Sequence, residues 1–145
     1  LLGLTQKSRL KGTTYLAWTT GRRRKGRLLA VAIVSIYRYR DERRRCGCLE
    51  FIASRRQGAG RLLIGHTRRF LAALGVPRLF SGADLSRPMA LRAHRSWGFR
   101  SVDLQEWASA GLKTYVTGDV CYMALELGGA PAPPDELRCP TSCAV

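Results

Sequence analysis

The chain has 145 residues, of which 46% are hydrophobic, and a formal net charge of +15. This length suits one domain with its own core, and the composition is ordinary for a folded globular protein. No apolar run approaches the roughly 20 residues needed to cross a bilayer, which argues against a membrane-spanning helix. The apolar start, Leu1-Leu2-Gly3-Leu4, is short and is followed closely by Lys7 and Arg9, so we expect no signal peptide.

A charge of +15 attracts nucleic acids and other polyanions. Most of the basic residues are arginines scattered along the chain, whereas a dedicated nucleic-acid binder usually clusters them on one face. Two runs, Arg22-Arg23-Arg24-Lys25 and Arg43-Arg44-Arg45, could still form such a patch. A basic module that binds nucleic acid or the ribosome therefore stays open as one interpretation.

The cysteine pattern favours reduced thiols. The chain contains an odd number of cysteines and no CxxC pair, and only His66 and His94 could assist them as metal ligands, so we expect no metal site. Cys46 and Cys121 fall in apolar, strand-like runs, where a buried free thiol is the usual arrangement. The remaining cysteines are Cys48, Cys139 and Cys143. This pattern predicts a reducing compartment, the cytoplasm.

The first part of the chain predicts a meander of three antiparallel strands. Residues 13–19 favour extended structure through their β-branched and aromatic side chains, and residues 21–26 read as a charged turn. Residues 27–38 form a long apolar run, which predicts a central strand. A polar turn at 40–45 then leads into a third strand at 46–53.

A glycine-rich turn, Arg55-Arg56-Gln57-Gly58-Ala59-Gly60, lies between this third strand and an amphipathic helix. Such a turn gathers free backbone N–H groups at the helix start, where the helix dipole adds about half a positive charge. Arg55, Arg56 and Arg61 add full charges around it. The pattern predicts a site for a phosphate or pyrophosphate.

The helix is expected from about Gly58 to Leu74, because Gly75 and then Pro77 form a normal stop signal. A short strand at 78–83 follows, and it should run parallel to strand 46–53 because a helix connects the two. Ser86 is the predicted cap of a second helix at 87–96, with Pro88 in its first turn.

The last part of the domain predicts a strand at 99–104, a loop that contains Trp107 and Gly111, and a closing strand at 120–127. From Gly128 the chain is rich in proline, so we expect a disordered tail over residues 128–145.

This order of elements resembles the GNAT superfamily of acyl-CoA-dependent N-acyltransferases. The turn Arg55-x-x-Gly58-x-Gly60 is similar to the family's Q/R-x-x-G-x-G/A turn. The segment from Ala90 to Phe99 is similar to its N-x-x-A-x-x-L/F-Y-x-x-x-G-F pattern, and residues 121–125 look like its closing strand. The resemblance covers roughly residues 13–127 and gains weight because the Gly98-Phe99 pair follows the turn in the right structural context.

The resemblance implies an α/β fold with a mixed, mostly antiparallel central sheet, a cofactor-binding helix and a splayed parallel strand pair. It implies a domain over residues 1–127 that lacks the first strand and helix of the family, since only about twelve residues precede Thr13.

The resemblance also implies acetyl-CoA as cosubstrate, with its pyrophosphate on the N–H groups of Gln57 to Arg61. The pantetheine arm would lie in the gap between strands 46–53 and 78–83. The family's helix-opening Asn falls on Arg87, so its hydrogen bonds are expected from Ser86 or Asp84. The implied cofactor-binding residues are Phe51, Ile52, Arg55, Arg56, Gln57, Gly58, Ala59, Gly60, Arg61, Ser86, Arg87 and Ala90.

Two catalytic roles are implied in the same way. The family's Tyr, a general acid for the CoA thiolate, falls on His94, whose ordinary pKa of about 6.5 suits proton donation. An exposed helix histidine beside Trp97 is the alternative. Glu50 is the carboxylate that could deprotonate the amine, and pairing with an arginine is its alternative. The N–H groups near Phe51 and Ile52 would polarise the thioester carbonyl like an oxyanion hole.

The predicted function is direct transfer of an acetyl group from acetyl-CoA to an amine. No convincing nucleophile for a covalent intermediate is visible. The positive charge disfavours strongly cationic acceptors and favours small neutral or acidic amines. We expect a monomer or homodimer without membrane contact. A truncated, non-catalytic CoA-binding domain stays open as another interpretation, beside the nucleic-acid module.

Overall fold

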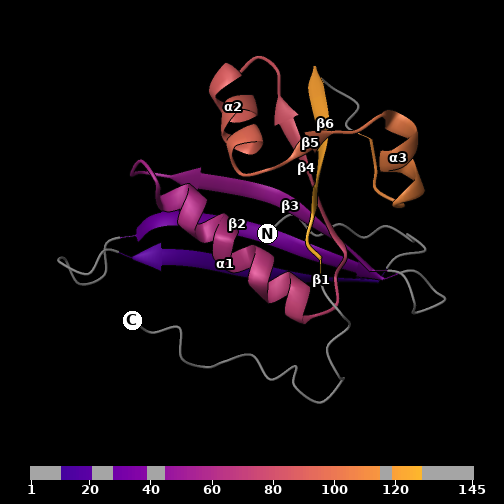
Figure 1. Cartoon of the computed structure of the whole chain (residues 1–145), viewed down its shortest axis with the longest axis horizontal. Coiled ribbons are helices and arrows are strands. Elements are labelled where there is room, and N and C mark those ends of the chain that lie inside the picture. The colour runs from indigo at the N-terminus through magenta and orange to yellow at the C-terminus, as the bar shows by residue number, and fades with distance from the viewer. Residues whose placement is uncertain (1–10, 21–27, 39–44, 115–118, 129–145) are drawn as a thin grey trace.

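The computed structural model describes residues 11–20, 28–38, 45–114 and 119–128, with the backbone alone described for 11–20. Six strands of this part of the chain form one sheet with the order β1-β2-β3-β4-β6-β5 (Figure 1). The predicted turn at 21–26, most of that at 40–45, the N-terminal segment and nearly all of the predicted tail lie outside the described residues.

The predicted meander is confirmed. β1 (Lys11–Thr20), β2 (Leu28–Arg38) and β3 (Arg45–Ser54) pair antiparallel in sequence order. Every second residue of β2 from Ala30 to Ile36 is buried, as period-two alternation over a half-buried sheet requires.

The helix and the parallel strand that follow are also confirmed. α1 (Ala59–Ala73) begins one residue after Gly58 and is followed by β4 (Arg78–Asp84), which pairs parallel with β3. α1 buries Leu63, Ile64, Thr67 and Leu71, whose spacing places them on one helical face. Leu74 is the C-cap of the helix, and Gly75 follows it with a φ of 71° that glycine adopts without strain.

The predicted cap of the second helix is wrong. α2 (Pro88–Ser96) has Arg87 at its N-cap position, and no side chain caps it. The Ser86 backbone N–H and hydroxyl both donate to Asp84 Oδ1, at 2.9 and 2.6 Å. Because Asp84 ends β4, its carboxylate reaches Ser86 within the turn before the helix, and the serine hydroxyl is occupied there.

The predicted strand at 99–104 and the predicted loop around Trp107 also need correction. β5 (Arg100–Ser101) is only two residues long, and α3 (Leu104–Ser109) occupies part of the predicted loop. The Asp103 carboxylate accepts a hydrogen bond from the Glu106 N–H at 2.7 Å, which caps this helix. Trp107 then lies buried, and its indole N–H donates to the Lys113 carbonyl at 3.0 Å.

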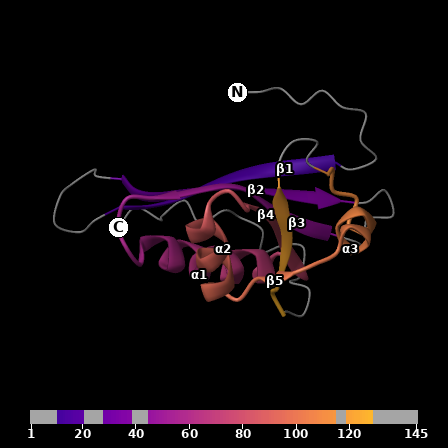
Figure 2. The ribbon, with the colours of Figure 1, turned by 90° about the horizontal axis from the view of Figure 1, so that it is seen from above.

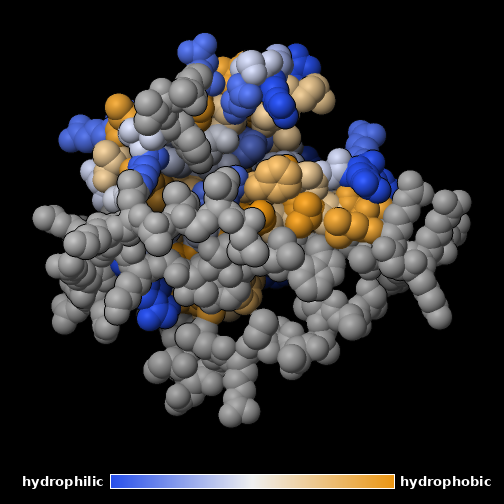
Figure 3. Space-filling view, turned by 180° about the vertical axis from the view of Figure 1, so that it is seen from behind, coloured by the Kyte–Doolittle hydropathy of each residue, from blue (hydrophilic) through white to orange (hydrophobic). Residues whose placement is uncertain are grey.

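β6 (Val120–Glu126) closes the sheet between β4 and β5, as predicted. α1 and α2 lie on one face of the sheet (Figure 2), and the larger core cluster fills the space between them and the strands. A second cluster on the opposite face joins α3 to β3, β4 and β6 through Trp107, Phe80 and Cys48. The surface on the side away from α1 combines a hydrophobic band with hydrophilic residues above it (Figure 3).

The cysteines of the described residues are free thiols. Cys46 is buried as predicted, and burial raises its pKa to about 11. Cys121 is only half-buried, since its strand lies beside the very short β5, and its Sγ lies 3.4 Å from Ser101 Oγ. Among the helices of the described residues, none has the length and apolar character that a membrane crossing requires.

Candidate functional site

β3 and β4 form a fork. Their parallel pairing covers three residue pairs, Gly47 with Leu79, Cys48 with Phe80, and Leu49 with Ser81. Beyond that point β3 continues to Ser54 beside β2, and β4 continues to Asp84 beside β6, so the two strands separate (Figure 1). The predicted splayed strand pair is therefore present, with Leu49 and Ser81 at its closed end.

A bulge in β3 lies directly at the fork. Val34 is opposite Leu49 and Ile33 is opposite Phe51, so Glu50 is the extra residue. Leu49 and Ile52 both contact the core on the α1 face, whereas Cys48 belongs to the cluster on the other face. Glu50, which bonds to Tyr37 of that second cluster, shares a face with Cys48, whereas simple alternation would place Ile52 on that face too. The bulge shifts the alternation by one residue.

The pairing with β2 determines which β3 amides point into the gap. The Arg55 N–H donates to the Leu29 carbonyl at 2.8 Å. In an antiparallel pair the hydrogen-bonded residues alternate, so the amides of Phe51 and Ala53 also face β2. The Ile52 N–H points the opposite way, toward the open edge beside β4.

The glycine-rich turn at the start of α1 lies at the open end of the fork. Gly58 has a φ of 84°, and no side chain caps the helix. The Ala59 N–H donates to the Arg56 carbonyl at 3.1 Å. Within the described residues the N–H groups of Gly58, Gly60 and Arg61 have no hydrogen-bond partner. Three free amides and the positive helix end fit a phosphate group well.

The surroundings of the turn are uniformly positive. Arg55, Arg56, Gln57 and Arg61 are exposed, and the first turn of α1 carries no acidic residue. None of these arginines takes part in an ion pair among the described residues. The Trp97 ring of α2 packs over the turn so closely that a Cβ on Gly60 would lie 3.2 Å from it. A side chain at position 60 would therefore require the Trp97 ring to shift by a few tenths of an ångström.

His94 is buried, with 5% of its surface exposed, so the alternative of an exposed histidine is wrong. Its ring lies between Trp97 and Phe99, at centroid distances of 5.2 Å from each. The two ring nitrogens have partners, since Nδ1 lies 2.8 Å from the Ala90 carbonyl oxygen and Nε2 lies 2.9 Å from Ser81 Oγ.

These contacts define the tautomer of His94. A carbonyl oxygen can only accept, so Nδ1 carries the proton and Nε2 accepts from the Ser81 hydroxyl. Burial lowers the His94 pKa from its ordinary value, and the bond to Ala90 opposes this shift. The ring is therefore neutral near pH 7, and it connects to the fork through Ser81.

Sequence reasoning missed Ser81. Alternation along β4 places it on the same face as Leu79 and Ala83, toward the helices. A hydroxyl on a core-facing position needs a buried partner, and this need could have pointed to the histidine of the next helix.

Glu50 lies on the other face of the sheet from His94. Its carboxylate accepts a hydrogen bond from the Tyr37 hydroxyl at 2.7 Å and is exposed. In the part of the chain that the structure describes, Glu50 makes no ion pair, so the alternative of an arginine partner finds no support there. Burial raises the pKa of Tyr37, and the bond to Glu50 adds to this shift. A neutral phenol thus holds the carboxylate one residue beyond the fork.

The remaining predicted residues lie at the start of α2. Ser86 and Arg87 both interact with Asp84, which accepts from Ser86 and lies 3.7 Å from Arg87 Nε. The Ser86 hydrogen bonds lower the Asp84 pKa. The Ala90 carbonyl orients His94. This group organises the β4–α2 turn, and the structure shows no direct connection between it and the glycine-rich turn.

The described residues contain no group of histidine, cysteine and acidic side chains that could hold a metal ion. The site thus consists of a phosphate-sized cluster of amides, a gap between two strands, and one titratable group on each face of the sheet.

Comparison with solved structures identifies proteins of similar fold. The sequence matches no protein-family model and no curated protein. Among solved structures, the ribosomal-protein-S18-alanine N-acetyltransferase from Escherichia coli is similar at 24% identity and a TM-score of 0.52, over 86% of this chain and 74% of that one. A putative GNAT-family acetyltransferase from Desulfovibrio desulfuricans is similar at 16% identity and a TM-score of 0.60, over 79% and 69%.

A Bacillus subtilis acetyltransferase solved in complex with CoA is similar at 17% identity and a TM-score of 0.52, over 79% of this chain and 76% of that one. These likenesses agree with the element order, the fork and the glycine-rich turn described above. The chain has the fold of the GNAT superfamily.

Proposed function

We propose that this protein is an N-acetyltransferase that moves an acetyl group from acetyl-CoA directly to an amine. One observation carries the proposal. In a GNAT fold, β3 and β4 separate beside an uncapped helix start, where the amides of Gly58, Gly60 and Arg61 are free and the arginines have no acidic partner among the described residues. A fold that only needed a strand-to-helix turn would have no reason to leave so much positive charge uncompensated.

The coenzyme pyrophosphate would be held by the free N–H groups of Gly58, Gly60 and Arg61, with Arg55 and Arg56 beside it. The pantetheine arm would extend along the open edge of β3 into the fork. There the Ile52 N–H, which faces the gap, would donate to the thioester carbonyl and stabilise negative charge on its oxygen. The orphaned amides support this arrangement, since a phosphate satisfies them and an empty turn leaves them to water.

Glu50 and His94 would act from opposite faces of the sheet. In a continuous sheet the strands would separate two such groups, but the fork lets both approach a molecule in the gap. Glu50 would take a proton from the ammonium group of the acceptor. The free amine nitrogen would then attack the carbonyl carbon, and the bond from that carbon to sulfur would break.

Ser81 would connect His94 to the departing thiolate. The neutral histidine accepts from Ser81, so it can act only after Nε2 gains a proton. That proton would be the second one that the attacking nitrogen loses as the amide forms, passed to Nε2 through the Ser81 hydroxyl. Nε2 would then donate to Ser81 Oγ, and the serine hydroxyl would release its own proton to the sulfur. The direct acid role expected for His94 thus becomes an indirect one, supported by the position of Ser81 at the closed end of the fork.

The net charge of +15 supports a small neutral or acidic amine as the acceptor, because the positive surface would repel a polycation. We also propose a cytoplasmic location, since Cys46, Cys48 and Cys121 are free thiols, as a reducing compartment keeps them.

Thermal unfolding with increasing acetyl-CoA tests the coenzyme site. Ligand at about 100 times its Kd should stabilise the protein by about 2.7 kcal/mol and raise the melting temperature by several degrees. Thiol release over a panel of neutral, acidic and cationic amines then tests transfer. Stabilisation without thiol release would leave a non-catalytic CoA-binding domain. Salt-sensitive DNA retention without any response to CoA would replace the proposal with a nucleic-acid module.

A further inference from the structure

The layer formed by α1 and α2 carries a single sign of charge. α1 contains Arg61, Arg68 and Arg69, α2 contains Arg92 and Arg95, and neither helix contains an aspartate or a glutamate. All of these arginines are exposed. None of them takes part in an ion pair among the described residues. The two helices therefore present a group of full positive charges for which the fold supplies no acidic partner.

The acidic side chains of the described residues lie outside this layer. They occupy the bulge of β3, the β4–α2 turn, α3 with its cap, and the two ends of β6, at Glu50, Asp84, Asp103, Glu106, Asp119 and Glu126. Glu106 and Glu126 are neutralised there by Arg78 and Arg100. The tertiary structure thus concentrates positive charge on the helix layer and places the acids elsewhere.

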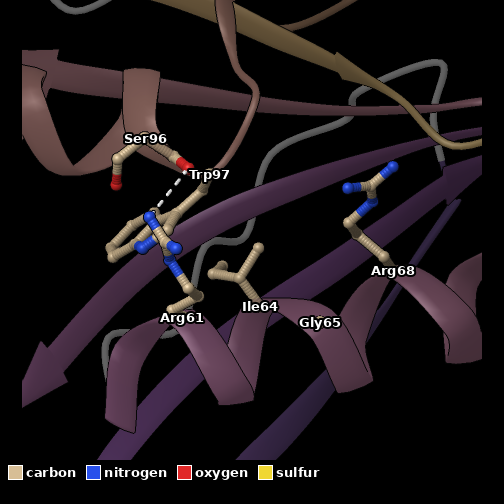
Figure 4. A pocket seen from close by; sticks show the side chains of 6 residues that line it. All are labelled: Arg61, Ile64, Gly65, Arg68, Ser96 and Trp97. Carbon is tan, nitrogen blue, oxygen red and sulfur yellow. Dashed lines mark hydrogen bonds between the residues drawn. The ribbon is translucent and has the colours of Figure 1, made fainter. Parts of the chain in front are cut away.

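The two helices meet, so their outer surfaces adjoin. Arg61 Nη2 of α1 lies 3.5 Å from the Ser96 carbonyl oxygen of α2. A small hollow separates the helices beside this contact, and Arg61 and Arg68 line it from the α1 side (Figure 4). Arg69 and Arg92 are not among the residues that line the hollow. They belong to the outer surface of the layer.

The helical geometry places Arg69 and Arg92 on the outward sides of their helices. α1 buries Thr67 and Leu71, and Arg69 stands two residues, or about 200° around the axis, from each. Arg92 stands two residues from the buried His94 of α2 in the same way. Both side chains therefore project to solvent, away from the glycine-rich turn. A coenzyme held at that turn would leave their charges uncompensated.

A partner for this surface has to offer many negative charges over a broad area. Protein interfaces concentrate apolar side chains at their centre and are depleted of charge there. The large exposed apolar side chains of the two helices are only Leu62 and Met89, one on each helix. Guanidinium groups spread over a surface suit the phosphates of a nucleic acid backbone, since each can form two parallel hydrogen bonds to one phosphate.

We propose that the outer surface of α1 and α2 binds the phosphate backbone of a nucleic acid without reading its bases. The inference goes beyond the proposed function and does not depend on it, because the surface lies outside the fork and the glycine-rich turn. α1 and α2 cover one face of the sheet (Figure 2), whereas Glu50 lies on the other. A nucleic acid bound to the helices would therefore leave the face of Glu50 open.

Fluorescence anisotropy with a labelled duplex of about 20 base pairs tests the inference, using DNA and RNA of one sequence. Binding should weaken steeply between about 50 and 200 mM salt, as counterion release requires. Arg69→Gln/Arg92→Gln should bind about tenfold more weakly. Its slope of log K against log salt should be shallower by about 1.8, as the loss of two phosphate contacts predicts. The duplex bound at the lower concentration identifies the nucleic acid.

Arg78→Gln/Arg100→Gln is the matched control. It removes the same charge and the same residue type from the sheet edge, where both arginines contact Glu106 and Glu126. Its affinity should stay within about twofold, with an unchanged salt slope. Lys113→Gln is a second control, since Lys113 is exposed beyond α3 and has no ion pair among the described residues. Thermal melting verifies that each variant is folded before the duplex is added.

The remaining outcomes each count against the inference. Absence of binding at about 50 mM salt would overturn it. Equal losses in the helix variant and the controls would overturn it too, because binding would then follow net charge alone. Tighter binding to phosphatidylserine vesicles or to polyglutamate than to either duplex would assign the surface to a membrane or an acidic protein instead.

The coenzyme site is tested separately. Acetyl-CoA should stabilise the Arg69→Gln/Arg92→Gln variant as much as the unmodified protein, because neither residue lies at the glycine-rich turn. Absence of any response to acetyl-CoA in both proteins would reject the proposed function. Salt-dependent duplex binding that Arg69→Gln/Arg92→Gln weakens would still support the helix surface in that case.

Discussion

Two groups of arginines in this protein have opposite surroundings. At the β4–β6–β5 edge, Arg78 and Arg100 both contact Glu106 and Glu126, with distances between 2.6 and 3.3 Å. At the start of α1 and along it, Arg55, Arg56, Arg61 and Arg68 have no acidic partner among the described residues. We call these the paired group and the unpaired group.

The difference distinguishes arginines that neutralise acidic side chains within the fold from arginines whose charge is available to an anion. The paired group is neutralised by its acidic partners and connects three strands, β4, β5 and β6, with α3, which is a structural role. The unpaired group repels itself in the free protein and gains most when an anion arrives. In a chain with a net charge of +15, composition cannot make this distinction, because both groups consist of the same residue type.

The largest expected effect comes from placing an acid in the unpaired group. Gly58→Glu puts a carboxylate at the amides proposed for the pyrophosphate, and it forces a side chain onto a residue with a φ of 84°. CoA affinity should fall at least a hundredfold, or about 2.8 kcal/mol, in titration calorimetry.

Gly58→Asn controls for the backbone, because asparagine tolerates the left-handed region and brings no charge. Space is available, since a Cβ on Gly58 would meet nothing within 4 Å. This variant should lose less than about tenfold in affinity. An acidic variant that binds CoA as well as the asparagine variant would remove the basis for the proposed pyrophosphate site.

The next effect concerns the acid sensitivity of the core beside the unpaired group. His94 packs against Trp97, which covers Gly60, and burial lowers the His94 pKa below its ordinary 6.5. The unfolded chain therefore takes up a proton at this residue that the folded chain resists. The contribution of neutral His94 to the unfolding free energy is fully present above the ordinary histidine pKa. It decreases as pH falls below that value toward the pKa of His94 in the folded protein.

His94→Gln should flatten that dependence. Denaturant unfolding between pH 7.5 and about 5 gives the comparison, since the window begins near the ordinary histidine pKa. The unmodified protein should lose more unfolding free energy across it than the variant loses. Parallel curves for the two proteins would show that His94 titrates in the folded state as freely as in the unfolded chain.

The smallest effect is expected in the paired group. Glu106→Gln removes a charge that contacts both Arg78 and Arg100, but these side chains are partly exposed, so solvent screens the interaction. The melting temperature should fall by at most a few degrees, and CoA affinity should not change.

Lowering the pH should weaken the ion pair between Arg100 and Glu106. Arg100 lowers the pKa of Glu106, so its contribution is present above the ordinary glutamate pKa of 4.5 and is lost as pH falls through the folded value. The unfolding free energy of the Glu106→Gln variant should lack this pH-dependent contribution. A clear loss of CoA affinity on Glu106→Gln would contradict the separation of the two groups.

Much of the fold was predictable because it depends on local patterns. The meander, α1, β4 and β6 have hydrophobic periods that a single segment displays, and the glycine-rich turn carries its own signal. α3 was missed although Asp103 and Glu106 have the spacing of a helix cap, because the surrounding residues resemble a loop. The cap of α2 was predicted wrongly because the Ser86 hydroxyl bonds to Asp84, two residues before it, and not to the helix.

By itself the sequence determined where most strands and helices form and where a glycine-rich turn opens a helix among arginines, since periodicity, glycine and charge act over a few residues. Only the tertiary structure decided the rest. The bulge at Glu50, the bond between Ser81 and His94, and the division of the arginines depend on neighbours distant in the chain. Register, burial and ion pairing are properties of contacts between segments, and a single segment does not contain them.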